Sequence, residues 1–197
     1  MVDVIGQEQI LGTQGLLLSA IRKNKFGSYI LFGPPGSGKT TIARLIAADS
    51  QLVLVELSAT ASGVSDLRRV FEEARRRRAV DMGTVLFIDE IHQFNKSRQD
   101  SFLPYLENGV LQLVGATTEN PSFELNSALL SRVLILKLNA LKKADLETIL
   151  IRSESLMKKK LPVTYEATEY LLNVAQGDAR KLTNLAEIIF LSEKQLT

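Results

Sequence analysis

The stretch from Tyr29 to Ala48, YILFGPPGSGKTTIARLIAA, decides the fold class of this 197-residue chain. The apolar and aromatic residues Tyr29–Phe32 predict a short buried strand. Residues Gly33–Thr40 match the phosphate-loop pattern G-x-x-x-x-G-K-[ST], and Lys39–Ala48 have the periodicity of a helix. This order of strand, glycine-rich loop and helix predicts an α/β protein whose loop binds phosphate groups.

Each part of the loop has a chemical reason. Glycines let the backbone wrap closely, so that its N–H groups face the phosphates, and the start of the next helix adds its positive end. Lys39 would reach the β- and γ-phosphates, and the hydroxyl of Thr40 would ligate Mg²⁺. A glycine-rich turn is the alternative, and the flanking strand and helix count against it. We therefore predict a nucleoside triphosphate site made by Gly33, Pro34, Pro35, Gly36, Ser37, Gly38, Lys39 and Thr40, with Thr41 beside it.

The chain around the loop has two parts. Short runs rich in Val, Ile and Leu alternate with helical patterns as far as Leu138, which predicts a parallel sheet. We expect its strands at Tyr29–Phe32, Leu52–Leu57, Val85–Ile88, Leu111–Thr117 and Val133–Leu138, and helices at Lys39–Ala48, Val64–Ala79, Ser97–Leu106 and Leu125–Ser131.

Beyond Leu141 the sequence predicts amphipathic helices only, at Asp145–Lys159, Tyr165–Val174 and Ala179–Leu191. We therefore expect an α/β core over residues 1–140 and an all-helical lid over residues 141–197. The abrupt ends of the sequence also lead us to expect part of a longer protein.

Composition limits the function only broadly. Hydrophobic residues make up 45% and charged residues 23% of the chain, which is ordinary for a soluble globular protein. No apolar run is long enough to span a bilayer and no signal-peptide pattern is present, so we expect a cytoplasmic protein without a membrane partner. The absence of cysteine excludes disulfides and thiolate metal sites, and a net charge of +2 is too small to indicate a nucleic-acid partner by itself.

A second motif, TVLFIDE at residues 84–90, ends a predicted buried strand in two carboxylates. Ligands of parallel sheets gather at the carboxyl ends of the strands, so Asp89 and Glu90 should lie beside the phosphate loop. Asp89 would hold Mg²⁺ partly through water, and Glu90 would polarise the attacking water as a general base. The alternative is a solvated acidic pair at a helix start. A nucleoside kinase would also need a second pocket for the acceptor of the phosphate, and the sequence does not indicate one.

Three polar residues near these motifs are less decisive. The strand LQLVGATTEN ends in hydroxyl and amide side chains that could contact the γ-phosphate or the attacking water, and we choose Thr118, with Asn120 in reserve. A strand-end turn would favour the same residues. His92 is the only histidine, and we interpret it as packing at a helix start, without a catalytic role.

Arginines supply the remaining candidates. Arg132 follows the pattern SALLS and could cap a helix C-terminus. Arg180, in GDARKL, lies near a helix N-terminus, where a cation is unfavourable, so it should contact an external anion. The run Arg75, Arg76, Arg77 and Arg78 could contact a DNA backbone, although a solvated helix face beside Glu72 and Glu73 explains it as well.

Together, GPPGSGKTT, LFIDE, GATT, LLSR and GDARKL resemble the AAA+ ATPases, in which they stand for Walker A, Walker B, sensor 1, the arginine finger and sensor 2. The runs DEIHQFNKSRQDSFLPYLENG and LVGATTENPSFELNSALLSR are similar to the replication-associated recombination protein A family, the bacterial relatives of the Werner helicase-interacting protein. VIGQEQILG and SATASGVSDLR match this family too.

The resemblance implies a P-loop NTPase with a three-layer αβα core, a five-stranded parallel sheet and a helical lid that is cut short here. It implies ATP and Mg²⁺ as cofactors, Val4 and Ile5 in the adenine pocket, Arg180 on the nucleotide, and Arg132 as a finger delivered to a neighbouring subunit. It also implies action on single-stranded DNA ends, gaps or stalled forks at the nucleoid, with a single-strand-binding protein as partner. A further C-terminal domain would make the full-length protein a homo-oligomer, whereas this piece could be monomeric.

Other functions remain as alternatives. A clamp-loader subunit usually has cysteine where this chain has Val133, and a Holliday-junction branch-migration motor shares the threonine sensor but not the NKSRQD run. A protein unfoldase needs an aromatic gripping residue, which SATASGVSDLR lacks. A scaffold that binds ATP and hardly hydrolyses it is the alternative from another class.

Overall fold

The computed structural model describes residues 4–12, 15–22 and 27–191, which form two compact units. The sheet unit contains residues 8–12, 15–22, 27–33 and 39–138, and the helical unit contains residues 4–7, 34–38 and 139–191. The phosphate loop is thus divided between them, with Gly33 and Lys39 in the sheet unit and Pro34–Gly38 in the helical unit.

The sheet unit is built on five parallel strands in the order β2-β3-β4-β1-β5. Their bounds are β1 Tyr29–Phe32, β2 Val53–Ser58, β3 Thr84–Asp89, β4 Gln112–Thr117 and β5 Leu134–Lys137. Strands β1, β3 and β4 are almost wholly buried, as expected for continuous apolar runs covered on both faces.

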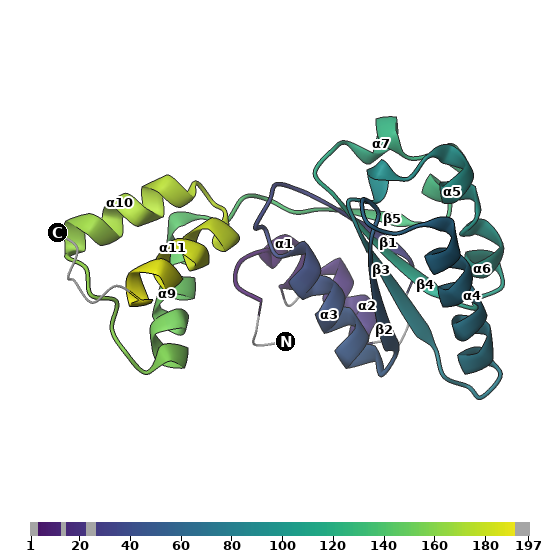
Figure 1. Ribbon diagram of the computed structural model, residues 1–197, viewed down its shortest axis with the longest axis horizontal. Coiled ribbons are helices and arrows are strands. Elements are labelled where there is room, and N and C mark those ends of the chain that lie inside the picture. The colour runs from purple at the N-terminus through teal and green to yellow at the C-terminus, as the bar shows by residue number, and fades with distance from the viewer. Residues whose placement is uncertain (1–3, 13–14, 23–26, 192–197) are drawn as a thin grey trace. The chain divides into compact units, whose positions relative to one another are not determined.

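Helices cover both faces of this sheet. Figure 1 shows α1 (Glu8–Leu11), α2 (Leu16–Arg22) and α3 (Lys39–Ser50) on one side, and α4 (Val64–Arg78), α5 (Lys96–Asp100) and α6 (Leu103–Glu107) on the other. On the second side, Phe71, Phe94 and Phe102 pack in one cluster with apolar residues of the strands. The predicted three-layer αβα core with a five-stranded parallel sheet is therefore confirmed.

Short elements connect these layers where the sequence predicted longer ones. A single helix was expected at Ser97–Leu106, but α5 ends at Asp100 and α6 begins at Leu103. Pro104 has no N–H to donate to the carbonyl of Asp100, and its ring would clash with that carbonyl in a continuous helix.

The helix expected at Leu125–Ser131 is shorter in the structure, where only α8 (Ser127–Leu130) lies within that range, and α7 (Pro121–Glu124) just before it was not predicted. Leu125 is extended, and the side chain of Asn126 accepts a hydrogen bond from the backbone N–H of Leu129 at 2.7 Å, which starts α8 anew. Helices α1 and α2 and the 3₁₀ helix η1 (Ile91–Gln93) were not predicted.

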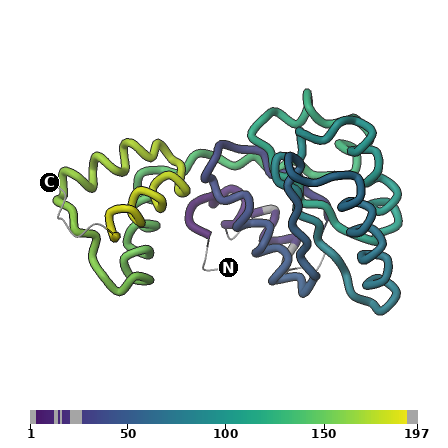
Figure 2. The backbone as a smooth tube through the Cα atoms, in the orientation of Figure 1, coloured from purple at the N-terminus to yellow at the C-terminus, as the bar shows by residue number. Residues whose placement is uncertain are grey.

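The helical unit contains α9 (Lys143–Met157), α10 (Tyr165–Ala175) and α11 (Ala179–Leu191). Figure 2 traces their backbones as three helices packed on one another, around a core that includes Leu146, Leu172 and Leu182. The prediction of an all-helical part after the sheet is confirmed, with helix ends shifted by no more than a few residues.

Candidate functional site

The phosphate loop begins where β1 ends. In the sheet unit, the ammonium group of Lys39 is buried and donates a hydrogen bond to the carbonyl oxygen of Gly33 at 2.8 Å. The backbone N–H of Gly33 in turn donates to the carbonyl oxygen of Thr117 at 3.2 Å, so the start of the loop is tied to the end of β4. Lys39 is the first residue of α3, with half-buried Thr40 and exposed Thr41 in the same turn.

The central part of the loop, in the helical unit, is held by Gln7. The side-chain amide of this buried residue donates to the carbonyl oxygens of Ser37 at 3.1 Å and Asn139 at 2.8 Å, and its oxygen accepts from the N–H of Asn139 at 3.1 Å. The hydroxyl of Ser37 donates to the carbonyl oxygen of Pro34 at 2.8 Å. Gln7 was not predicted as a site residue, although it lies two residues after Ile5 in the segment VIGQ.

The loop glycines are required by the backbone. Gly36 and Gly38 have φ angles of +65° and +97°, a region that residues with a side chain rarely adopt. At Gly36 a Cβ atom would lie 1.8 Å from a carboxylate oxygen of Asp178. The carbonyl oxygen of Gly36 accepts a hydrogen bond from the N–H of Ala179 at 3.3 Å. At Gly38 no heavy atom lies within 4 Å of the position of a Cβ, so this part of the loop has open space beside it for a ligand.

The acidic pair lies at the carboxyl end of β3, as the sequence predicts. Asp89 is the last residue of the strand, and its carboxylate accepts from the N–H of Glu90 at 3.2 Å. Glu90 has left-handed backbone angles, φ +52° and ψ +46°, which cost a residue with a side chain about 1–2 kcal/mol. Strained backbone angles of this kind cluster at functional sites, and at Glu90 they turn the chain sharply from β3 into η1.

The buried threonine beside this pair is Thr117 and not Thr118. The side chain of Thr118 is exposed, and that of Asn120, the reserve candidate, accepts from the N–H of Ser122 and caps α7. The hydroxyl of fully buried Thr117 lies 2.9 Å from Nδ1 of His92. The contact expected of Thr118, or of Asn120, stays a prediction, and Thr117 is a further candidate for it.

Arg132 lies at the other end of the sheet unit. It comes two residues before β5, whose first residue pairs with Tyr29 at the start of β1. Its guanidinium donates to a carboxylate oxygen of Glu107 at 2.8 Å and to the carbonyl oxygen of Ala128 at 2.7 Å. The four residues of β1, about 3.3 Å each, separate this end from the loop, so Arg132 cannot reach the Lys39 end of its own sheet unit.

The remaining candidates have simpler surroundings. Arg180 is exposed in the first turn of α11, where the carboxylate of Asp178 accepts from its backbone N–H at 2.8 Å. Val4 and Ile5 are half-buried in the helical unit.

The basic run forms the last turn of α4. Arg77 pairs with Glu73 at 3.0 Å, and Arg75 lies over the ring of Tyr105 at 4.9 Å, whereas Arg76 and Arg78 are exposed. The structure thus gives two of the four arginines partners within their own chain.

The oxygens near the loop suit magnesium. Thr40 and Asp89 offer a hydroxyl and a carboxylate, the hard ligands that Mg²⁺ combines with water and substrate phosphates. Among residues 4–12, 15–22 and 27–191, no group of three or more His, Cys, Asp or Glu could hold a metal ion by itself. In that same part of the chain, no helix has the length and hydrophobicity needed to cross a membrane.

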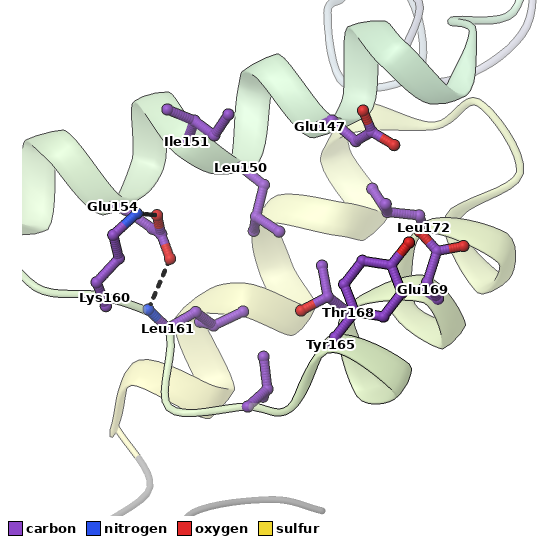
Figure 3. A pocket seen from close by; sticks show the side chains of 11 residues that line it. Glu147, Leu150, Ile151, Glu154, Lys160, Leu161, Tyr165, Thr168, Glu169 and Leu172 are labelled. Atoms are coloured by element: carbon purple, nitrogen blue, oxygen red, sulfur yellow. Dashed lines mark hydrogen bonds and ion pairs between the residues drawn. The ribbon is translucent and has the colours of Figure 1, made fainter.

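The helical unit has a cavity of about 650 Å³ between α9 and α10. Figure 3 shows Leu150, Tyr165 and Leu172 lining it, with the carboxylate of Glu154 joined to Lys160 and to the backbone N–H of Leu161 at its rim. None of its lining residues belongs to the predicted site.

Comparison with known proteins identifies the family. The sequence pattern of the ATPase family associated with various cellular activities (AAA) matches residues 29–141, which include the phosphate loop, the acidic pair and Arg132. The chain belongs to the AAA family of ATPases.

Relatives of this AAA chain include proteins named for replication and recombination. It is 46% identical over 192 residues to replication-associated recombination protein A of Coxiella burnetii and 40% identical over 194 residues to that of Escherichia coli K12. It is 42% identical over 197 residues to the ATPase WRNIP1 of Dictyostelium discoideum. These matches cover 95–98% of the AAA chain but only 43%, 43% and 22% of the respective relatives, so it spans less than half their length.

Among solved structures, the AAA chain is similar to the Holliday junction branch migration motor RuvB of Thermotoga maritima. The TM-score is 0.77 at 29% identity, over 98% of this chain and 66% of that one. A single-residue variant of the same motor gives a TM-score of 0.76 at 31% identity, over 94% of this chain and 62% of that one.

Proposed function

We propose that this AAA chain is the ATP-binding and ATP-hydrolysing module of a protein that maintains DNA replication and recombination at stalled or gapped forks. The observation that carries the hydrolytic part is the strand order. Because β4 lies between β1 and β3, Thr117 stands between the start of the phosphate loop and the acidic pair. Phosphate-binding, hydroxyl and carboxylate groups thus meet at one edge of the sheet.

The roles follow from chemistry. Lys39 and the loop backbone bind the triphosphate, and Thr40 and Asp89 hold Mg²⁺, which neutralises charge on the phosphates. Glu90 takes the proton of the attacking water, and Thr117 positions that water or the γ-phosphate. Val4 and Ile5 are our candidates for the adenine pocket, and Arg180 is our candidate for contact with the phosphates.

Assembly completes the site. Arg132 lies at the end of the sheet away from its own phosphate loop, and this supports delivery to the nucleotide of a neighbouring subunit. A cation supplied in this way stabilises the transition state and is worth about 10³–10⁵ in rate. We therefore propose that the full-length protein is a homo-oligomer with a site at each subunit contact.

Similarity to proteins named for replication-associated recombination supports the DNA-maintenance role. It favours single-stranded ends, gaps or forks as the DNA, a single-strand-binding protein as partner, and the cytoplasmic nucleoid as location. The exposed Arg76 and Arg78 at the end of α4 are our candidates for contact with the DNA backbone.

A second candidate is branch migration, which the likeness to the RuvB motor favours. The test measures ATP turnover and DNA binding by the full-length protein with forked, gapped, duplex and four-way-junction DNA, using Lys39→Ala as the inactive control. We expect Mg²⁺-dependent turnover and tighter binding to forks and gaps than to duplex. Junction movement would favour the second candidate. ATP binding without turnover under any condition would overturn the enzymatic part and leave a scaffold.

A further inference from the structure

His92 is buried among the groups that the proposed reaction uses. It lies in η1, two residues after Glu90, and its side chain is only 6% exposed. Its Nδ1 atom lies 2.9 Å from the hydroxyl of Thr117 and 3.3 Å from Oε2 of Glu90. One ring nitrogen therefore faces both the residue at the end of β4 and the proposed general base.

Glu90 needs such a neighbour. Its Oε2 atom is inaccessible to solvent, and among the residues that the structure describes it has no partner with standard hydrogen-bond geometry. The contact with Nδ1 of His92, longer than that with Thr117, is the ion-pair contact found for this oxygen. A buried carboxylate oxygen is costly without a donor, so the nitrogen facing it should carry a hydrogen.

The contacts of the ring with Thr117 and Gln93 agree with a hydrogen on Nδ1, whereas Oε1 of Glu119, at 3.4 Å from Nε2, is an acceptor on the opposite side. The Thr117 hydroxyl accepts from the N–H of Glu119 at 3.0 Å and lies 3.2 Å from the carbonyl oxygen of Glu119, to which it can give its own hydrogen. It is then an acceptor toward Nδ1. The amide nitrogen of Gln93 lies 3.0 Å from Nε2 and can donate to it when the hydrogen of the ring is on Nδ1.

We propose that His92 is a positioning residue that holds the carboxylate of Glu90 through Nδ1–H and ties it to Thr117. This inference rests on the proposed function, because it assigns to Glu90 the role of general base. The left-handed backbone of Glu90 turns the chain so that a residue two positions later comes back against the carboxylate. Through this contact, the end of β4 sets where the base points.

Substitutions at this position separate positioning from packing. In Asn the side-chain amide nitrogen stands about where Nδ1 stands in His, whereas in Gln it reaches about as far as Nε2. His92→Asn should therefore keep kcat within about threefold, while His92→Gln and His92→Ala should lower kcat by about tenfold or more, since misplacing a catalytic group by about 1 Å can cost 10²-fold. ATP affinity should stay within about threefold in all three. Gln93→Ala, which removes only the contact to Nε2, is the matched control with unchanged kcat.

A double variant tests whether His92 acts through Glu90. If it does, adding His92→Ala to Glu90→Gln should change the residual turnover by less than about twofold, because residues that act as one unit are not additive. If the loss of turnover in the double variant equals the product of the losses in the two single variants, His92 acts independently of Glu90 and the inference is wrong. If wild type hydrolyses ATP and His92→Ala has the same kcat, the inference about His92 is wrong but the proposed function stands. If wild type binds ATP without hydrolysing it, the proposed function is wrong as well.

Spectroscopy gives a readout that does not depend on turnover. His92 is the sole histidine, so the ¹⁵N signals of its ring are unambiguous in histidine-labelled protein. We expect the pattern of a ring with hydrogen on Nδ1, and a change of the Nδ1 signal in Glu90→Gln that exceeds the change of the Nε2 signal. A hydrogen on Nε2 alone, or a ring that does not respond to Glu90→Gln, would contradict the inference. Circular dichroism and thermal unfolding of each variant show whether the fold is retained.

Discussion

Arg132 and Glu107 form an ion pair of 2.5 Å at the end of the sheet where β1 and β4 begin. The same arginine donates to the carbonyl oxygen of Ala128, so it also caps the short helix α8. In the single chain, Arg132 therefore has the capping role that its sequence position predicts. A role in catalysis requires that a neighbouring subunit bring a phosphate to it, and this requirement can be tested.

Arg132→Ala should leave ATP affinity nearly intact and remove most of the turnover of the assembled, full-length protein, because the cation acts on a neighbour's phosphates. Glu107→Gln is the matched control, since it weakens the ion pair but keeps the arginine, and its turnover should stay near that of wild type. Mixed assemblies of Arg132→Ala and Glu90→Gln should recover part of the activity, because some contacts then combine an intact base with an intact finger. Verified mixed assemblies that stay as inactive as their parents would exclude action in trans.

Lys39→Ala should abolish ATP binding or nearly so. The substitution removes the buried ammonium group that lies 2.8 Å from the carbonyl oxygen of Gly33, at the start of the loop. Titration with a fluorescent ATP analogue measures the effect. An affinity within about threefold of wild type, roughly 0.65 kcal/mol, would show that the loop binds phosphate without this cation.

Glu90→Gln should bind ATP normally and hydrolyse it at least about 10² times more slowly, since help from a general base is typically worth 10²–10⁴. The amide keeps the shape of the side chain but cannot take the proton of water. Single-turnover measurements separate this loss from slow product release. Turnover at the wild-type level would mean that another group is the base.

Gln7→Ala should weaken both the fold and the nucleotide site. Its buried amide joins Ser37 of the loop to Asn139, and removing it leaves buried backbone groups unpaired, at about 1–3 kcal/mol. We expect a lower thermal midpoint and an ATP affinity reduced by about tenfold. Gln9→Ala, two residues later, is the control: its exposed amide lies 3.5 Å from the carbonyl oxygen of Lys137, away from Ser37 and Asn139, so both effects should be smaller than in Gln7→Ala. Equal behaviour of the two variants would show that Gln7 does not hold the loop.

Glu154 should make the helical unit sensitive to acid. Burial acts to raise the pKa of its carboxyl, but hydrogen bonds from Lys160 and from the N–H of Leu161 together outweigh burial and hold the pKa below the ordinary value of 4.5. A carboxylate with a lowered folded pKa contributes stability above the unfolded pKa, and this stability is lost as the pH falls through the folded pKa. Thermal unfolding followed from neutral pH to below 4.5 should therefore show a steeper loss in wild type than in Glu154→Gln, which cannot ionise.

The positions of the strands could be predicted from the short runs of Val, Ile and Leu. The positions of the motifs could be predicted because glycine, lysine and paired carboxylates rarely occur at such spacings by chance. The choice between Thr117 and Thr118 could not. Successive side chains of a strand point to opposite faces, and only the structure shows that Thr117, the last residue of β4, is buried while Thr118 is exposed.

The contacts of His92 and Gln7 were also beyond the sequence. Both depend on left-handed backbone angles, at Glu90 and at Gln7 itself. Glutamate and glutamine rarely adopt such angles, so the sequence does not predict them. Pro104 is the opposite case, because its missing N–H predicts the break between α5 and α6 although the apolar residues around it have helical periodicity.

The position of β1 between β4 and β5 has a consequence for synthesis on the ribosome. Strands β2 and β3 pair with each other as soon as both have emerged, but β1 pairs only with β4 and β5, which are made last. A nascent chain that ends at Glu90 thus carries both the phosphate loop and the acidic pair, yet the strand before the loop has no neighbour to fix it. The strand before the loop gains its first neighbour only when β4 is made, so a shorter nascent chain should bind nucleotide weakly.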